Sequence, residues 1–425
     1  MKEQRLGIDF GTSNTSASTL RENGRTFLFP LQRHLNTQPS GVFIRQDGYN
    51  SVGFNAINDY INTDPRREPF HYIPSIKQGL PVSYYEGVSL KALKIDNGRY
   101  PIKFFETEEI ASYIIKDVIT HASKYGKVSE QVVLGRPVRF SDNKNDDNLA
   151  QKRLETAAKL AGFKEVHFVF EPVAAAINYE RFQMKASKNM VFVFDFGGGT
   201  LDTCVLKLGN GEKISDKIVS SYGISLGGTD LDKDVFRRQL MHYFGSQATF
   251  GANRSNMPYH IFNDLTEWHL SSQLNNSNVL NDLRQIQKDK NCSNKDAVER
   301  LLNLIQYQQV PSILKSVETA KISLSRKNNT NIEYDSPTFQ IKEPLSRSSF
   351  NEVIRLRVEE IQSCISECLL LAGINEEKID IALKVGGSSK NKFVDDILKN
   401  RFSKIIDTTE LTSVAAGLGL VAAEL

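Results

Sequence analysis

Two short acidic, glycine-rich segments carry residue types suited to holding a phosphate chain and a divalent cation. Residues 9–14 read DFGTSN, and residues 195–200 read DFGGGT. Glycine lets backbone N–H groups approach an anion closely, and Thr or Ser hydroxyls add donors, so each segment could cradle phosphate. A carboxylate beside a phosphate repels it unless a cation lies between them. Asp9 and Asp195 therefore predict Mg²⁺, held through its water shell.

The two segments belong to a distant internal repeat, almost half the chain apart. Each follows a short apolar run and precedes a second run that ends at an Asn-Gly turn. This pattern predicts strand, glycine turn, strand, Asn-Gly turn, strand. The first copy comprises residues 6–9, residues 14–20 and Asn23-Gly24, and the second comprises residues 190–195, residues 201–208 and Asn210-Gly211. One such segment alone would be an ordinary β-turn, but the matched pair predicts two lobes of similar α/β construction.

Two Gly-Gly pairs, at residues 227–228 and 386–387, each precede a helical pattern. Free N–H groups at the start of a helix make a site for an anion or a ribose. Each pair alone is equally explained by plain capping through Thr229 or Ser388. Together with the two acidic segments, the pairs predict a ring of nucleotide contacts.

The composition is that of an ordinary soluble protein and excludes several classes. A hydrophobic fraction of 40% and a charged fraction of 24% rule out a mainly disordered, collagen-like or coiled-coil chain. The 53 basic and 50 acidic residues give a net charge of +3, so nothing indicates a nucleic-acid or membrane partner. The N-terminus is too polar for a signal peptide, and four cysteines make no disulfide framework. We expect a cytoplasmic protein with reduced thiols.

The elements that must position these residues alternate between strand and helix. Apolar residues recur at a helical period in residues 108–125, and Gly162 ends a second helix over residues 148–161. A strand at residues 166–170 leads into Glu171-Pro172, which opens a helix. Further helices are predicted over most of residues 230–325, at residues 350–372, and in the Ala- and Gly-rich residues 412–425.

Taken together, the motifs resemble the superfamily of actin, sugar-kinase and heat-shock-chaperone ATPases. The most similar family is the nucleotide-binding (ATPase) domain of the DnaK-type heat-shock chaperones. GIDFGTSNT resembles its first phosphate loop, FDFGGGTLD its second, FVFEPVAAAINY its first connecting helix and VGGSSKNK its adenosine loop. SLGGTDLDKDV and SVETAKISLS resemble two further segments. Because the chain ends where the family's apolar linker would begin, it is most similar to the short YegD-like branch, which lacks the peptide-binding domain.

This resemblance implies an α/β, two-lobed actin-like ATPase fold, with duplicated ribonuclease-H-like lobes around a deep nucleotide cleft. Lobe I would comprise residues 1–187 and lobe II residues 188–404, with residues 405–425 as a helix that returns to lobe I. The implied cofactors are ATP or ADP and Mg²⁺. The implied partner is an unknown protein of the co-chaperone or nucleotide-exchange type.

The resemblance also assigns roles to individual residues. Asp9 and Asp195 would hold Mg²⁺ through water. The phosphate contacts would be Gly11, Thr12, Ser13, Asn14, Gly197, Gly198, Gly199 and Thr200. The catalytic group would be Lys77, Glu171, Asp195, Thr200 and Asp202. The remaining nucleotide contacts would be Gly227, Gly228, Glu318, Lys321, Ser325, Gly386, Gly387, Ser388 and Lys390.

The sequence departs from the family in its adenine-binding arginines, in its interdomain relay and in its tail, LTSVAAGLGL, which lacks the acidic residues of the matching hinge segment. The family brackets adenine with two arginines, whose positions here are Ile322 and Lys390, so weaker stacking on the base is expected. Pro137 matches the proline of the family's interdomain relay, but the position of the relay arginine is Gln151, with Arg153 two residues further on.

Three functions remain open from the sequence. A chaperone-like ATPase that hydrolyses ATP slowly is favoured by the EPVAAA segment and Lys77. A small-molecule kinase on the same fold would need an acceptor pocket and a general base. A nucleotide-sensing interaction module with little hydrolysis is favoured by the missing arginines. A filament-forming actin relative is the weakest alternative.

Overall fold

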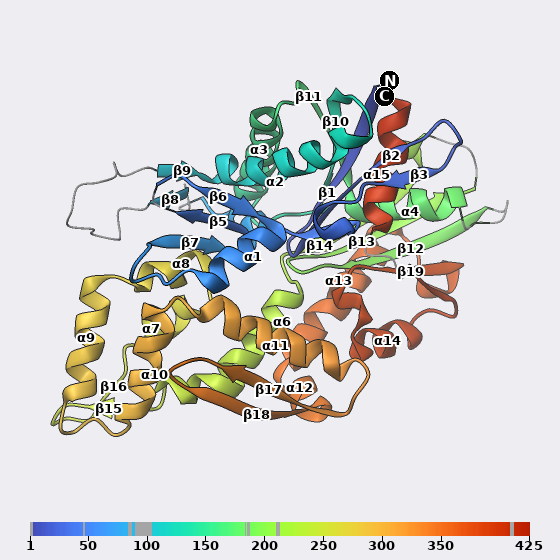
Figure 1. The fold of residues 1–425 in the computed structure, drawn as a ribbon. Coiled ribbons are helices and arrows are strands. Elements are labelled where there is room, and N and C mark those ends of the chain that lie inside the picture. Colours follow the sequence, from blue (N-terminus) through green and yellow to red (C-terminus); the bar gives the residue numbers. More distant parts are fainter. Residues whose placement is uncertain are drawn as a thin grey trace.

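The computed structural model describes residues 3–45, 47–83, 87–89, 104–182, 184, 188–209, 213–408 and 412–425. It is a mixed α/β molecule in which both chain termini lie at the same end (Figure 1). The predicted turn at Asn210-Gly211 lies outside the described residues. Within the described ranges, no helix has the length and apolar character that crossing a membrane would need.

Two large sheets repeat the same strand order. The first runs β3-β2-β1-β10-β11, with β4 paired to β2, and the second runs β14-β13-β12-β19-β20. The first comprises β1 (Gln4–Phe10), β2 (Asn14–Leu20), β3 (Thr26–Leu28), β4 (Thr37–Pro39), β10 (Val128–Arg136) and β11 (Glu165–Phe170). The second comprises β12 (Asn189–Phe196), β13 (Leu201–Leu208), β14 (Ile218–Ile224), β19 (Ile381–Val385) and β20 (Ile405–Asp407). The common order confirms the duplicated α/β construction.

The two acidic residues occupy matching places in the two sheets. Each lies one residue before the end of a strand that pairs antiparallel with the next strand, Asp9 opposite Ser16 and Asp195 opposite Asp202. The same strands pair in parallel with β10 and β19 on their other sides. Residues 191–196 of β12 are buried throughout, as expected for a strand covered on both faces.

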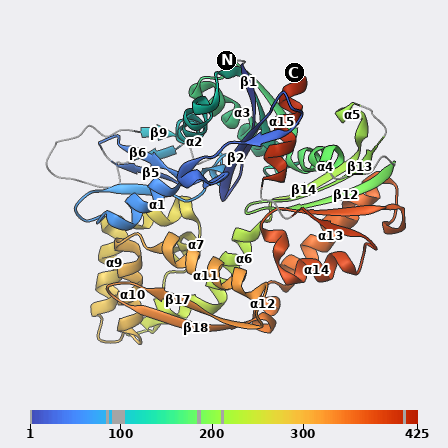
Figure 2. The ribbon, with the colours of Figure 1, turned by 45° about the vertical axis from the view of Figure 1, so that its right-hand side comes forward.

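Helices and sheets alternate in five layers. Helices α2 (Thr107–Ala122) and α3 (Lys144–Ala161) cover the outer face of the first sheet. Helices α4 (Glu171–Phe182) and α15 (Ser413–Glu424) fill the space between the sheets. Helices α13 (Arg355–Ala372) and α14 (Lys392–Lys399) pack on the outer face of the second sheet (Figure 2).

The Ala- and Gly-rich composition of α15 follows from how closely it packs. A Cβ at Gly417 would lie 1.8 Å from the carbonyl oxygen of Ala174 in α4, and one at Gly7 of β1 would lie 2.2 Å from the nitrogen of Gly419. The Ser18 hydroxyl in β2 also donates to the carbonyl of Ala415 at 2.7 Å. Only residues without a side chain allow this approach, so the C-terminal helix is held in the first half of the molecule.

Each half carries an additional smaller unit. In the first half these elements are β5 (Val42–Arg45), β6 (Asn50–Val52), α1 (Gly53–Asn62), β7 (Phe70–Ile73), β8 (Gly87–Ser89) and β9 (Phe104–Glu106). In the second half they are α6 (Gly228–Val235), β15 (Thr249–Phe250), β16 (Ser255–Asn256), α7 (Tyr259–Leu265), α8 (Trp268–Ser271), α9 (Ser277–Lys288), α10 (Lys295–Gln306), α11 (Val310–Leu324), β17 (Asn329–Asp335), β18 (Gln340–Ser346) and α12 (Arg347–Val353). The short helix α5 (Ile214–Lys217) joins β13 to β14. The mainly helical character predicted for residues 230–325 is thus observed, whereas the lobe boundaries themselves stay a prediction.

Candidate functional site

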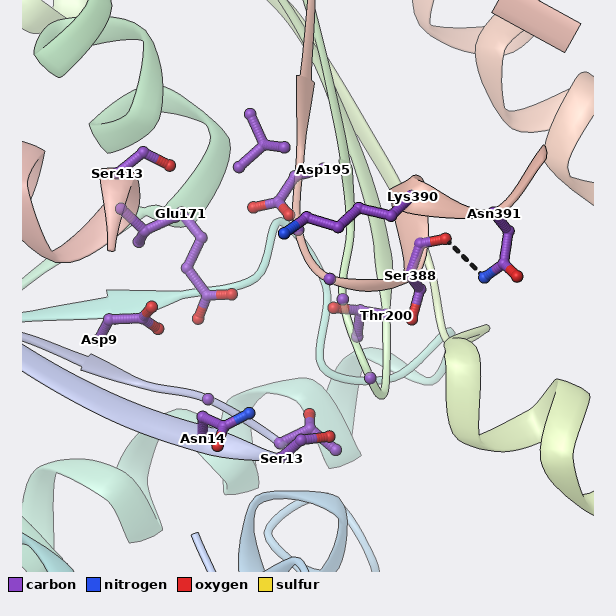
Figure 3. A pocket seen from close by; sticks show the side chains of 18 of the residues that line it. Asp9, Ser13, Asn14, Glu171, Asp195, Thr200, Ser388, Lys390, Asn391 and Ser413 are labelled. Atoms are coloured by element: carbon purple, nitrogen blue, oxygen red, sulfur yellow. Dashed lines mark hydrogen bonds between the residues drawn. The ribbon is translucent and has the colours of Figure 1, made fainter. Parts of the chain in front are cut away.

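Most of the predicted site residues line one cavity of about 360 Å³ between the two halves. Its walls come from the β1–β2 turn, the β12–β13 turn, the end of α11 and the loop after β19 (Figure 3). The predicted residues that line it are Asp9, Gly11, Thr12, Ser13, Asn14, Lys77, Glu171, Asp195, Gly197, Gly198, Thr200, Glu318, Lys321, Ser325, Gly386, Gly387, Ser388 and Lys390. Residues far apart in the sequence therefore share one cleft.

The two glycine-rich turns, one from each half, lie against each other at the cleft. A Cβ at Gly198 would lie 2.6 Å from the Ser13 hydroxyl oxygen, and one at Gly199 would lie 2.7 Å from that of Thr12. Side chains at these positions would push the turns apart. Glycine thus leaves the hydroxyls of the first turn next to the backbone of the second, an arrangement that can surround a phosphate chain.

Gly227 and Gly228 lie behind the cleft lining and hold the second turn in place. The Gly228 N–H donates to the carbonyl of Gly197 at 3.0 Å, and the Thr229 N–H donates to that of Gly198 at 2.9 Å. A Cβ at Gly227 would lie 2.2 Å from the Gly198 oxygen. These glycines were predicted as nucleotide contacts, and the structure gives them a supporting position.

Acidic side chains and one lysine gather at the closed end of the cleft. Figure 3 shows Asp9, Glu171 and Asp195 with their carboxylates turned into the same space. The Lys77 ammonium donates to Glu171 Oε1 at 2.5 Å, and both residues are buried. Asp202 is buried beneath the lining, where it accepts hydrogen bonds from the Thr200 hydroxyl at 2.8 Å and the Val138 N–H at 2.6 Å.

Crowding of these acids away from water changes their proton affinity. Desolvation, together with the charge of Glu171, raises the pKa values of Asp9 and Asp202 to about 7 and that of Asp195 well above its usual range. Burial alone would lower the pKa of Lys77, but the charges of Glu171 and Asp9 raise it. The cluster thus favours binding of an added cation that would compensate its negative charge.

The donor set fits a hydrated cation better than a directly coordinated one. Within the described residues, no group of three or more His, Cys, Asp or Glu side chains is close enough to bind a metal directly. Mg²⁺ usually keeps several of its waters, and Asp9 and Asp195 face each other across the cleft as partners for those waters. Both residues therefore suit the water-mediated role predicted for them.

We expect the nucleotide-free protein to lose thermal stability as the pH rises from about 4, near the pKa of an unfolded aspartate, to about 7. An aspartate whose folded pKa is about 7 binds its proton more tightly in the folded than in the unfolded chain. This contribution to stability is complete at low pH and disappears as the pH passes the folded pKa. The check is thermal unfolding of wild type and Asp202→Asn in chelator, where the variant should lose less Tm over this range. An equal or larger loss in Asp202→Asn would contradict the assignment.

At the other end of the cleft, α11 presents an apolar residue instead of a cation. The Ile322 side chain lines the cleft and is 58% exposed. The Lys321 ammonium beside it donates to Asp232 Oδ2 and to the carbonyl of Gly228, both at 2.7 Å, and is buried. Lys321 therefore links α11 to α6. Its positive charge is paired with the carboxylate of Asp232.

Two residues that line the cleft were not predicted from the sequence. Asn391 and Ser413 line the cleft, and the Asn391 amide donates to the carbonyl of Ser388 at 3.0 Å (Figure 3). Ser413 begins α15, which reaches the cleft only because it packs between the sheets. Local spacing does not encode that placement.

Arg136, which precedes Pro137 in the sequence, links the end of β10 to helix α3. The Arg136 guanidinium bonds to both carboxylate oxygens of Asp147, at 2.9 and 3.0 Å, and to the amide oxygen of Gln151 in α3. Arg153 donates instead to the carbonyls of residues 79, 80 and 82, directly after Lys77. Helix α3 is thus linked to Asp202 through residues 136–138 and to the Lys77 segment through Arg153.

Comparisons with known proteins agree with this construction. The family model described as "Hsp70 protein" matches residues 5–306 and 293–423. The chain is 23% identical to "Chaperone protein dnaK" of Cyanidioschyzon merolae over 99% of its own length and 62% of that protein. It is 26% identical to "Chaperone protein DnaK" of Thermosipho melanesiensis and of Thermosipho africanus, over 95% of its own length and 56% of theirs. The chain thus spans somewhat over half the length of these relatives, and with its duplicated, actin-like ATPase fold it belongs to the Hsp70 family.

Proposed function

We propose that this chain binds Mg-ATP in the cleft between its two halves and hydrolyses it slowly to ADP and phosphate. The observation that carries the proposal is the meeting of Asp9, Asp195 and the Lys77–Glu171 ion pair beside two facing glycine-rich turns. Mg²⁺ would neutralise charge on the phosphate chain when bound. Relatives named "Chaperone protein DnaK" support a chaperone role.

The residues at the closed end have separate tasks in the proposed reaction. The Lys77 ammonium stabilises negative charge on the transferring phosphoryl group. Glu171 orients the attacking water, and Asp202 acts from beneath the lining by holding the hydroxyl of Thr200, which lies beside the γ-phosphate. The water oxygen forms a bond to the γ-phosphorus and gives up a proton that passes to solvent, while the bond from that phosphorus to the bridging oxygen breaks and leaves its electron pair on ADP.

Single-turnover hydrolysis tests this proposal. Protein in excess over radiolabelled ATP, with Mg²⁺ and no acceptor, should form ADP, and Asp195→Asn should form it far more slowly. A kinase should be nearly silent without an acceptor, and a nucleotide-sensing module should gain thermal stability with Mg-ATP while forming no ADP. Absence of both ADP and thermal stabilisation at millimolar ATP would overturn the proposal.

The output of the cycle is proposed to be nucleotide-dependent binding of a protein partner of the co-chaperone or nucleotide-exchange type. Closure of the two halves around a nucleotide changes their relative placement, and a partner that binds one placement better responds to the nucleotide. Co-purification from cell extract with ATP, with ADP and without nucleotide, with Asp195→Asn as the control, should yield a partner in only some of these states.

Contacts between the two halves, away from the cleft lining, should influence how fast nucleotide leaves. The Tyr60 hydroxyl in α1 donates to the carbonyl of Gln308 at 2.8 Å and lies 3.0 Å from the Ser312 hydroxyl of α11. Removing a buried hydrogen bond costs roughly 0.5–1.5 kcal/mol, so Tyr60→Phe should speed nucleotide release about two- to tenfold. Stopped-flow displacement of a fluorescent nucleotide measures this rate. Tyr49→Phe, which removes a tyrosine hydroxyl bonded to Asp59 in the same half, should leave it unchanged, and equal rates in both variants would count against the role of Tyr60.

A further inference from the structure

A second cavity, of about 270 Å³, adjoins the phosphate end of the cleft. The two cavities share Thr12, Lys77 and Thr200 in their walls. The rest of the second cavity is lined from both halves, with Gln78 and Phe140 on one side and Ser225, Glu267 and Trp268 on the other. The position expected for the γ-phosphate therefore lies between two openings.

The second cavity leads from the buried interior toward the surface. Thr12 and Lys77 at its inner end are 7% and 5% exposed. Ser225 is an exposed residue, and the Glu267 side chain is 30% exposed. The nucleotide cleft reaches the surface elsewhere, at the exposed Ile322 of α11. The two routes thus diverge from the same phosphate-binding end.

The charged groups of the second cavity compensate one another. The Lys233 ammonium lies 2.9 Å from Glu267 and 3.5 Å from Asp230. Asp230 also accepts the Gly227 N–H at 2.8 Å, and Glu267 lies 3.4 Å from Arg237. Both carboxylates are engaged, which argues against either one serving as the general base toward an acceptor hydroxyl. A lining of paired charges neither repels a small anion strongly nor holds it tightly.

We propose that this second cavity is the route by which orthophosphate leaves after hydrolysis while ADP still occupies the cleft. The proposal rests on the proposed ATPase function and adds an exit distinct from the nucleotide's own. ADP would fill the cleft between the phosphate turns and Ile322, so phosphate formed beyond its β-phosphate has that path blocked. The second cavity begins at the residues that would hold the γ-phosphate, and it reaches solvent without passing the nucleotide.

A hydrogen bond joins the two halves along the wall of this route. The Gln78 amide donates to the Thr229 hydroxyl oxygen at 2.8 Å. The Thr229 hydroxyl itself donates to the carbonyl of Gly198 at 2.8 Å and so stays in place without Gln78. Gln78→Ala should therefore widen the route without disturbing the second phosphate turn.

A cysteine at the outer end allows the route to be blocked after folding. Ser225→Cys would be labelled with a bulky maleimide, and Ser215→Cys, at an exposed serine outside the cavity, is the matched control. The four native cysteines are buried, and maleimide-treated wild type checks that they do not react. In single turnover, labelled Ser225→Cys should form ADP at the control rate but release phosphate to a fluorescent phosphate-binding sensor at least fivefold more slowly. Gln78→Ala should release it faster.

A second readout does not need hydrolysis. Orthovanadate entering protein already loaded with Mg-ADP should retain a fluorescent ADP analogue, and the rate of this trapping reports access to the γ-phosphate position. Labelled Ser225→Cys should trap at least fivefold more slowly than labelled Ser215→Cys. Slow trapping together with absent ADP formation would support the route while contradicting the proposed hydrolysis. Normal ADP formation with unchanged phosphate release and unchanged trapping would overturn the route and leave the hydrolysis standing.

Discussion

Replacement of Lys77 by methionine is expected to lower single-turnover ATP hydrolysis by about 10²–10³-fold and to change ATP affinity far less. The Lys77 ammonium is buried at the closed end of the cleft and bonds to Glu171 at 2.5 Å. Charge on the phosphoryl group grows in the transition state, so loss of the cation raises the barrier more than it weakens binding. Methionine keeps the length and apolar stem of the side chain while removing the charge.

The variant will also lose stability, because Glu171 is left buried beside an apolar group. Lys217→Met separates this effect from the chemistry. Lys217 pairs with Glu180 at the same 2.5 Å and is 8% exposed, but lies outside the cleft. Thermal unfolding should show similar losses for both variants, and quenched-flow hydrolysis should fall only for Lys77→Met. A wild-type rate in Lys77→Met, or an equal fall in Lys217→Met, would remove Lys77 from the proposed mechanism.

The fold could be predicted from the sequence because the pattern of strand, glycine turn and strand occurs twice and involves only neighbouring residues. Each acidic hairpin carries its own strand, turn and strand pattern, and the copies predicted two equivalent sheets before any long-range contact was known. The turns came out as expected because glycine at 198 and 199 is required by the opposing hydroxyls of Thr12 and Ser13. A glycine-rich turn can therefore be predicted from its residue types alone, because those residues determine its backbone conformation.

Side-chain partners across long sequence separations were harder to predict. Lys321 matches a nucleotide contact in its motif, yet its ammonium is engaged by Asp232, 89 residues away. The Arg136 side chain bonds to Asp147 and Gln151 of α3, a pairing that the motif around Pro137 does not indicate. These ion pairs depend on which charged side chains the fold brings within bonding distance. The spacing of residues along the sequence does not contain that information.

We expect this chain to bind ATP more weakly than the family pattern implies. The reason lies at Ile322 and Lys390, which line the cleft where the family has two arginines. Ile322 can pack against an adenine ring but offers no planar guanidinium, and Lys390 is a compact, strongly hydrated cation. Burial of the Lys321 ammonium against Asp232 keeps that charge from replacing the missing stack. A stacked cation contributes ~0.5–2 kcal/mol, so two weakened positions should raise the ATP dissociation constant roughly tenfold or more, at ~1.4 kcal/mol per decade.

Ile322→Arg with Lys390→Arg should therefore tighten ATP binding by about tenfold and increase the preference for ATP over GTP. Ile322 is 58% exposed, so an arginine can enter without displacing the core. Leu356→Arg is the matched control for added charge, because Leu356 is 60% exposed on α13 and outside the cleft lining. Calorimetric titration of wild type and both variants with each nucleotide measures the change. If the double variant binds no tighter than Leu356→Arg, or if wild type already binds ATP tightly and selectively, then other residues hold the base, with Asn391 and Ser413 the first to substitute because they line the same cleft.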